Sequence, residues 1–182
     1  MKKHLFILAA MMLILTGCSQ NKNKTAKTLV AYFSATGNTE AVAKDLAEVT
    51  GGTLYEITPE ARYTAADIDW RDTTSRCYVE MHDRAFRPAI VKSLEDADSY
   101  DVVYIGFPVW WNTAPTIVNT FIESYGFEGK TVILFATSGG SVLDQANNEF
   151  YAAYPKINWK EGRVLNRQSK EQLRNWVESL NL

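Results

Sequence analysis

Residues 28–39 read Thr-Leu-Val-Ala-Tyr-Phe-Ser-Ala-Thr-Gly-Asn-Thr, and they combine an apolar run with a turn rich in hydroxyl and amide side chains. Its apolar first half predicts a buried strand, and the amphipathic stretch that follows Thr39 predicts a helix. The N–H groups that begin a helix have no intrahelical partner and carry partial positive charge, so they can bind a phosphate. The turn adds side-chain donors, and its glycine allows close approach of the backbone. We therefore predict a phosphate-binding loop that consists of Ser34, Ala35, Thr36, Gly37, Asn38 and Thr39.

This loop matches neither of two common nucleotide-binding motifs. A Walker loop carries a lysine after its second glycine, and no lysine follows Gly37. The dinucleotide fingerprint needs three glycines, and Gly37 stands alone. The alternative interpretation is a solvent-exposed turn whose serine and asparagine side chains cap the helix.

Strand and helix patterns alternate along the rest of the chain. Strands are expected at 28–33, 53–57, 101–106, 131–135 and 163–165. Helices are expected from the loop to Gly51, from Ala114 to Tyr125, from Val142 to Ala153, and after a capping box of Ser169 and Gln172. The fully apolar strand 131–135 is typical of a parallel sheet with both faces covered. Five such strand–helix units predict an α/β fold.

The segment from Val30 to Leu46 resembles the sequence motif of the flavodoxin family. The matching positions are Val30, Tyr32, Ser34, Gly37, Thr39, Ala43 and Leu46, and Ala31 is the one departure. Over residues 27–182, the resemblance implies a three-layer sandwich around a five-stranded parallel sheet of order 2-1-3-4-5. In that order, ligands bind outside the carboxyl ends of the strands, at the topological switch point. The loops after the first, third and fourth strands are therefore expected to form the site.

The loops after the third and fourth strands have unusual compositions. The first contains Pro108, Val109, Trp110, Trp111 and Asn112, and the second contains Thr137, Ser138, Gly139 and Gly140. Two adjacent tryptophans in a loop point in different directions, so they are not both expected in the core. An indole can stack on the flat, electron-poor ring system of a flavin. The alternative is that both rings seal the following helix against the sheet.

The Pro-x-Trp-Trp loop resembles that of a group of small flavodoxin-like proteins. This resemblance implies non-covalent FMN binding through residues 34–39, 107–112 and 137–140. In the family, hydroxyls and main-chain N–H groups hold the single FMN phosphate without a metal ion. The flavin supplies the redox chemistry, so no catalytic side chain is expected. A cofactor-free binding protein on the same fold stays open as an alternative.

Other enzyme classes lack the residues that they need. Ser138 and Ser141 lie outside any Gly-x-Ser-x-Gly motif, and His82 is the one candidate imidazole beyond the N-terminal segment, which disfavours a hydrolase. Cys77 has no Cys-x-x-Cys partner, so it is expected to be a small buried side chain. One histidine and one cysteine cannot form a zinc site.

The N-terminal residues resemble a bacterial lipoprotein signal peptide. Lys2 and Lys3 precede an apolar run at 5–15, which is shorter than the roughly 20 residues that span a bilayer as a helix. Leu-Thr-Gly-Cys at 15–18 resembles a lipobox, which implies cleavage after residue 17 and lipid attachment to Cys18. We predict a signal peptide at 1–17, a flexible tether at 18–26 and a domain at 27–182, in the cell envelope outside the cytoplasm. The alternative is an ordinary signal peptide with a chance cysteine.

The charge of the chain limits its partners. The full sequence has a net charge of −2, and loss of Lys2 and Lys3 leaves 17 of the 19 basic residues against 21 acidic ones, about −4. That balance argues against nucleic acid. The expected partners are a small-molecule or protein redox partner and, through the lipid anchor, the membrane.

The cysteine count excludes an intrachain disulfide framework. Only Cys77 remains besides Cys18, so none is expected despite export. The oligomeric state stays open.

Residues 59–88 do not fit a simple alternation of strand and helix. The segment carries four aromatic residues and five arginines, which are Tyr63, Trp70, Tyr78, Phe86, Arg62, Arg71, Arg76, Arg84 and Arg87. Long irregular segments in compact domains are often functional, so one interpretation is a lid over the flavin or an arginine cluster for an anionic ligand. The other, which we favour, is an extended crossover whose aromatic rings complete the core and whose charges are solvated.

The tryptophan loop also bears on the number of electrons transferred. One-electron carriers of the family resemble one another in a glycine directly after the stacking aromatic residue, where a peptide can flip to bond the one-electron-reduced flavin. Here Trp111 and Asn112 follow Trp110, and neither has the backbone freedom of glycine, although asparagine tolerates left-handed geometry. The modest negative charge also lacks the field that would steer basic partners. We favour an FMN-dependent oxidoreductase that passes two electrons to a small acceptor such as a quinone, over a membrane-tethered one-electron carrier.

Overall fold

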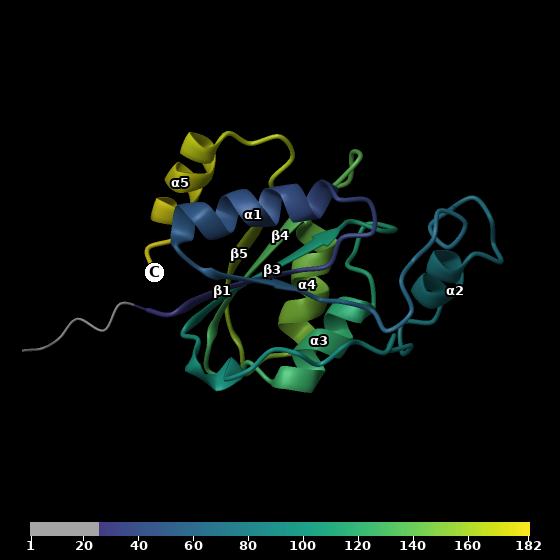
Figure 1. Ribbon diagram of the computed structural model, residues 1–182, viewed down its shortest axis with the longest axis horizontal. Helices are drawn as coiled ribbons and strands as arrows, with labels where there is room; N and C mark the ends of the chain where they lie inside the picture. The colour runs from purple at the N-terminus through teal and green to yellow at the C-terminus, as the bar shows by residue number, and fades with distance from the viewer. Residues whose placement is uncertain (1–25) are drawn as a thin grey trace, which may run out of the picture.

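The computed structural model describes residues 26–182, so the predicted signal peptide and Cys18 lie outside the described residues. Five parallel strands form one sheet in the order β2-β1-β3-β4-β5 (Figure 1). The strands are β1 (Thr28–Tyr32), β2 (Thr53–Glu56), β3 (Val102–Pro108), β4 (Thr131–Thr137) and β5 (Asn158–Val164). The helices are α1 (Asn38–Thr50), α2 (Arg76–His82), α3 (Ile117–Tyr125), α4 (Asp144–Ala153) and α5 (Lys170–Ser179), with a 3₁₀ turn at Ala97–Ser99. The predicted α/β sandwich and its strand order are confirmed.

Helices cover both faces of the sheet. Side chains alternate between the two faces along each strand, so the apolar strands need cover on both sides. Val30 and Ile133 belong to a core cluster with residues of α1 and α5. Leu29 and Val132 belong to a second cluster with residues of α3 and α4. All four side chains are fully buried. Burial on both faces explains why the central strands read as continuous apolar runs in the sequence.

The edge strand β5 begins earlier than its sequence pattern indicates. It spans Asn158–Val164, whereas the apolar residues predict a strand only at 163–165. No residue of β5 is buried, so no apolar run marks the strand. Its pairing with β4 also shifts register between Ile133 and Phe135. Gly162 lies opposite this shift, where an added Cβ would come within 2.5 Å of a β4 carbonyl oxygen.

The helix boundaries differ from the prediction at two starts. α3 starts at Ile117, and Pro115 lies before it, with its carbonyl accepting a hydrogen bond from the following turn. α4 starts at Asp144 rather than at Val142, whose side chain is largely exposed. The other signals are confirmed, since α1 ends at Gly51 in the left-handed conformation and α5 begins with the predicted capping box.

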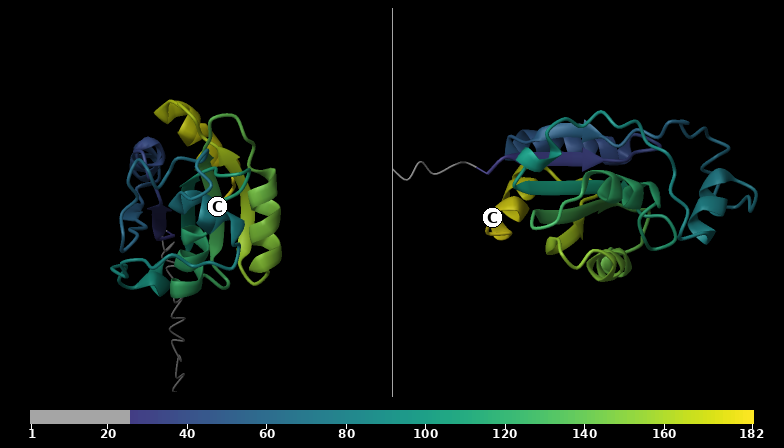
Figure 2. Two further views of the ribbon diagram at one scale, coloured as in Figure 1. Left: turned by 90° about the vertical axis from the view of Figure 1, so that its right-hand side faces the viewer. Right: turned by 90° about the horizontal axis from the view of Figure 1, so that it is seen from below.

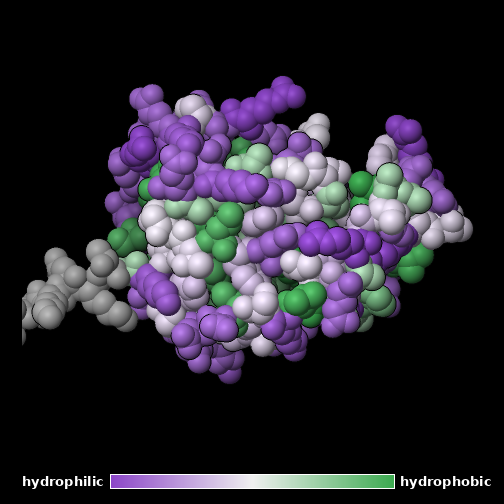
Figure 3. Space-filling view, viewed as in Figure 1, coloured by the Kyte–Doolittle hydropathy of each residue, from purple (hydrophilic) through white to green (hydrophobic). Residues whose placement is uncertain are grey.

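Residues 59–90 form a lobe that projects beyond the carboxyl ends of the strands, and we call it the α2 lobe (Figures 1 and 2). A bridge between Pro59 and Ile90 closes its base. Tyr63 packs against the core, with its ring centroid 5.4 Å from that of Phe33. Trp70, by contrast, is 63% exposed, and Figure 3 shows hydrophobic residues on the surface of the lobe. The expectation that the aromatic residues of this segment complete the core is therefore correct for Tyr63 and wrong for Trp70.

Three arginines of the α2 lobe form close ion pairs with carboxylates of the protein. The ion pairs are Arg76–Glu80 at 2.6 Å, Arg87–Glu123 at 2.8 Å and Arg84–Glu149 at 3.2 Å. They fasten the lobe to itself, to α3 and to α4, so these three side chains are not gathered for an anionic ligand. Cys77 is buried, as expected. Within residues 26–182, no helix is long and apolar enough to cross a bilayer.

Candidate functional site

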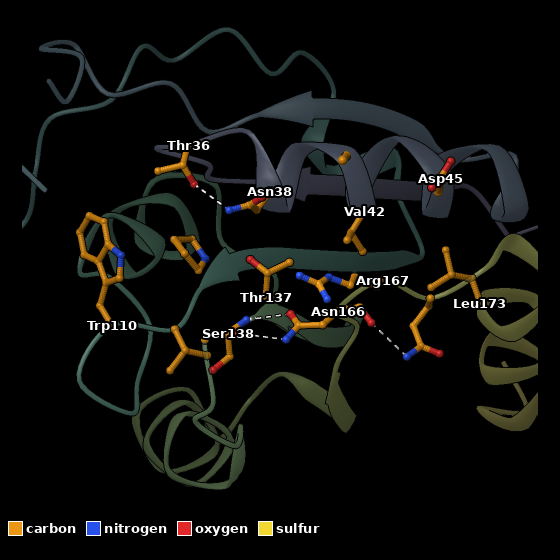
Figure 4. A pocket seen from close by; sticks show the side chains of 15 residues that line it. Thr36, Asn38, Val42, Asp45, Trp110, Thr137, Ser138, Asn166, Arg167 and Leu173 are labelled. Carbon is orange, nitrogen blue, oxygen red and sulfur yellow. Dashed lines mark hydrogen bonds between the residues drawn. The ribbon is translucent and has the colours of Figure 1, made fainter. Parts of the chain in front are cut away.

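A cavity of about 680 Å³ opens at the carboxyl ends of β3 and β4, between the start of α1 and the loop after β5 (Figure 4). Of the residues predicted for the site, the cavity is lined by Thr36, Asn38, Pro108, Val109, Trp110, Thr137, Ser138 and Gly139. The predicted residues that do not line it are Ser34, Ala35, Gly37, Thr39, Trp111, Asn112 and Gly140. All three predicted loops therefore meet at one cavity, and each contributes some of its residues.

The loop before α1 leaves backbone donors available. Gly37 occupies the position before the helix with φ of 86°, and no side chain caps the helix. The turn is exposed at residues 36–38, but the interpretation that serine and asparagine side chains cap the helix is wrong. The Ser34 hydroxyl instead accepts a hydrogen bond from Gly37 N at 3.1 Å, and the Asn38 amide donates to the Thr36 hydroxyl at 3.1 Å. Within the described residues, the N–H groups of Thr36, Asn38 and Thr39 have no acceptor.

The Thr39 side chain is buried and does not line the cavity. It is 1% exposed, and its hydroxyl oxygen lies 2.8 Å from that of Thr137, the last residue of β4. The first turn of α1 is therefore tied directly to the strand whose loop forms another wall of the cavity. This is a structural role for a residue that the sequence pattern assigns to phosphate binding through its side chain.

A tight turn sends the two tryptophans in different directions. Trp110 and Thr113 exchange two main-chain hydrogen bonds of 2.9 and 3.0 Å, so Trp111 and Asn112 form a two-residue turn. Both turn residues are left-handed, with φ of 46° and 64°, as in the tight turns of β-hairpins. The turn is held to α4, because the Thr113 hydroxyl donates to Glu149 at 2.5 Å. The interpretation that both rings seal α3 against the sheet is wrong.

Trp110 forms the aromatic wall of the cavity. Its ring lies edge-on to Phe33 and Tyr63, with centroids 5.7 Å away in each case. Trp111 lies outside, 37% exposed, against Tyr78 and His82 of α2. The prediction of a ring that faces the site is therefore met by Trp110 alone.

A polar cluster in the α2 lobe fixes Tyr63, whose ring packs against Trp110. The Tyr63 hydroxyl donates to the Glu80 carboxylate, which also accepts from Arg76 Nε at 2.6 Å. The Arg76 guanidinium lies 3.9 Å above the Tyr63 ring. Burial, and then the bond to Glu80, raise the pKa of Tyr63 well above its ordinary value. The hydroxyl therefore stays protonated and fixed, and the Tyr63 ring packs against Trp110. The sequence pattern gives no signal for this cluster.

The loop after β5 supplies three cavity residues that the sequence analysis missed, namely Asn166, Arg167 and Gln168. The Asn166 side chain binds the backbone of Ser138 in both directions, accepting from its N–H at 2.9 Å and donating to its carbonyl at 2.5 Å. These bonds fix the loop after β4 (Figure 4). The only available signal was positional, since every loop after a parallel strand lies at the same edge of the sheet.

Comparisons with known proteins agree with this geometry. The flavodoxin family matches residues 27–180 of the chain. Two crystal structures of candidate flavoproteins are similar over nearly their whole length. The one from Bacteroides uniformis is 56% identical, with a TM-score of 0.82, and covers 84% of this chain and 98% of its own. The one from Bacteroides eggerthii is 49% identical, with a TM-score of 0.84, and covers 86% of this chain and 99% of its own.

A more distant structure shares the fold. It is a flavoprotein from Lactobacillus acidophilus in complex with FMN, 22% identical, with a TM-score of 0.67 over 86% of this chain and 99% of its own. The comparison with curated proteins gives no significant match. The family match covers nearly all of the described residues, and the sheet order and the three loops agree with it. The chain belongs to the flavodoxin family.

Proposed function

We propose that the protein binds one FMN in the cavity between α1 and the loops after β3, β4 and β5. The observation that carries this proposal is that one cavity combines free backbone donors, at Thr36 and Asn38, with the aromatic wall of Trp110. The donors suit a phosphate, and the indole suits a flat ring. The volume of about 680 Å³ lies within the roughly 300–1,000 Å³ typical of cofactor and ligand sites.

The chain would hold the cofactor without a catalytic side chain of its own. Thr36 and Asn38 would bind the phosphate, Trp110 would pack against the ring, and the backbone at Gly139 would approach its polar edge. FMN, when bound, supplies electron transfer, and the protein supplies binding and orientation. Fluorescence titration of the purified protein with FMN is the direct test. We expect saturation at one FMN per chain and a yellow protein, and a colourless protein in excess FMN would overturn the proposal.

We further propose an oxidoreductase that passes two electrons to a small acceptor such as a quinone. Support comes from the turn at Trp111 and Asn112, which two main-chain hydrogen bonds and the Thr113–Glu149 bond hold in one conformation. A peptide flip there would change the backbone torsion angles of Trp111, which already has a positive φ that tryptophan rarely adopts. The alternative is a membrane-tethered one-electron carrier, which the tolerance of Asn112 for left-handed geometry favours.

Stepwise anaerobic reduction of the FMN-loaded protein separates these two functions. A two-electron enzyme converts oxidised flavin to fully reduced flavin with little one-electron-reduced species in between. A large and stable blue species at half reduction would establish the one-electron carrier instead.

We also propose that Cys18 carries a lipid that anchors the domain to the membrane. The support is the sequence around Cys18, and the physical basis is that each buried CH₂ of an acyl chain contributes about 0.8 kcal/mol. Metabolic labelling with palmitate should mark the wild-type protein and not a Cys18→Ala variant. Label on that variant would contradict the anchor.

A further inference from the structure

The loop after β5 brings a single cation to the cavity. Arg167 is the only lysine or arginine among the residues that line it. In Figure 4 its side chain runs from this loop into the cavity, in the space below Val42. Within residues 26–182, its guanidinium has no hydrogen bond and no ion pair. The cavity therefore presents one positive charge that no carboxylate of the described chain neutralises.

The acidic residue of the cavity is occupied by another cation. Asp45 also lines the cavity, and its carboxylate lies 3.6 Å from the ammonium group of Lys170, which binds Glu48 at 2.5 Å as well. Lys170 belongs to α5 and does not line the cavity. Because Asp45 pairs with Lys170, it does not neutralise Arg167, and the guanidinium can bind an anion from outside the chain.

The backbone at Arg167 is held in a conformation that arginine rarely adopts. Its φ is 51°, in the left-handed region. The two bonds between the Asn166 amide and the Ser138 backbone fix the preceding residue to the loop after β4. The Gln168 amide adds a bond of 3.3 Å to the Asn166 carbonyl. Unfavourable backbone geometry that the surroundings enforce is concentrated at functional sites.

We propose that Arg167 is a phosphate-binding residue that neutralises the phosphate of the bound flavin. A phosphate monoester carries about −1.5 to −2 charges at pH 7, whereas the start of a helix contributes only about half a positive charge. The Thr36 hydroxyl and the N–H groups of Thr36 and Asn38 add donors without formal charge. A guanidinium supplies the missing charge and two parallel donors. The assignment rests on the proposed function, and it adds a cation from the loop after β5 to a phosphate site whose other groups are neutral.

The test compares FMN with riboflavin, which has the same ring system and no phosphate. The variants are Arg167→Met, Arg167→Lys and, as a matched control, Arg174→Met. Arg174 is an exposed arginine of α5 that also lacks a partner among the described residues and does not line the cavity. Dissociation constants are measured by fluorescence titration at low and high salt, and circular dichroism shows that each variant is folded.

We expect Arg167→Met to weaken FMN binding roughly ten- to a hundredfold while riboflavin binding stays within about twofold of wild type. Its FMN affinity should also depend less on salt, because a charge pair is gone. Arg167→Lys should recover part of the loss, and Arg174→Met should match the wild type for both ligands. An Arg167→Met protein that keeps wild-type FMN affinity, or loses FMN and riboflavin equally, would overturn the assignment. A wild-type protein that binds neither flavin would overturn the proposed function itself.

Discussion

The side-chain oxygens of Thr39 and Thr137 lie 2.8 Å apart, and both residues are more than nine-tenths buried. Thr39 belongs to the first turn of α1 and Thr137 ends β4. The bond therefore joins the element after one cavity loop to the element before another. A phosphate held at the start of α1 and a ring held by the loop after β4 would therefore rest on parts that are fastened together. The bond fixes the position of the first turn of α1 relative to the end of β4.

Replacing Thr39 with valine should destabilise the flavin-free protein by roughly 1–3 kcal/mol, because the hydroxyl of Thr137 would remain buried without a partner. The double variant Thr39→Val, Thr137→Val should recover most of that loss, since both polar groups are then removed. Urea unfolding of the single and double variants measures the difference. If the two substitutions simply add, the hydroxyls do not interact.

The two tryptophans should differ sharply in their effect on flavin binding. Trp110→Ala should weaken FMN binding by roughly 1–3 kcal/mol, the range found when an aromatic stacking partner is lost. Trp111→Ala should have a much smaller effect, because Trp111 packs on α2 outside the cavity. Fluorescence titration gives both affinities. Equal losses would show that the flavin contacts both rings.

The conformation of the turn should control how much one-electron-reduced flavin accumulates. Trp111→Gly removes the side chain and frees a backbone that has φ of 46°. It should raise the largest fraction of this species seen in an anaerobic titration. Trp111→Ala is the matched control, because it removes the ring and keeps the Cβ. If alanine raises the fraction as much as glycine, the ring and not the backbone limits the species.

Tyr104, which is buried, and Tyr154, which is half-buried, should respond in opposite ways to loss of the hydroxyl. The Tyr104 hydroxyl has no hydrogen-bond partner among the described residues. Tyr104→Phe should therefore raise the free energy of unfolding by about 1 kcal/mol. The Tyr154 hydroxyl donates to Glu123 at 2.8 Å and accepts from Asn119 at 3.0 Å. Tyr154→Phe should lower the free energy of unfolding by about 1–2 kcal/mol. Urea unfolding at neutral pH checks both signs.

The protein should lose stability in alkaline solution. Burial raises the pKa of Tyr104 above its ordinary value, and burial followed by the negative charges of Glu40 and Glu56 raises the pKa of Tyr32 to about 12. Above the unfolded value of about 10, the unfolded chain releases these protons while the folded chain keeps them, so the free energy of unfolding falls as the pH rises. Tyr104→Phe should show a shallower fall between about pH 9 and pH 11. An unchanged slope would contradict the assigned direction.

The sequence predicts those parts of the site that local composition encodes. Gly37 and its hydroxyl-rich neighbours mark the loop before α1, and the pair Trp110–Trp111 marks the loop after β3. It does not predict which tryptophan faces the cavity, because that depends on positive φ at two residues that are not glycine. Composition and spacing alone could not have shown it.

Contacts between distant segments are the other part that sequence reasoning misses. Tyr63 meets Glu80 only because the α2 lobe folds back on itself, and Asn166 meets Ser138 only because β5 lies beside β4. The sequence pattern indicates only the end of β5, because none of its residues is buried and no continuous apolar run marks the strand. The loop after it, with Arg167, was not expected at the site, because its composition carries no signal like that of the loops after β1, β3 and β4.

The direction of β1 sets how an anchored domain would face a membrane. β1 starts at Thr28, next to Lys27, whose N–H donates to Asp101 at 2.9 Å, and it runs towards the end of the sheet that faces the α2 lobe (Figure 1). The cavity opens at that end. A lipid on Cys18 would attach at the edge opposite the cavity, through nine residues that reach about 30 Å when extended. The attachment point and the mouth of the cavity would then lie at opposite ends of the strands. An acceptor dissolved in water would reach the mouth directly, whereas a quinone in the lipid would meet it only when the predicted tether lets the domain turn over.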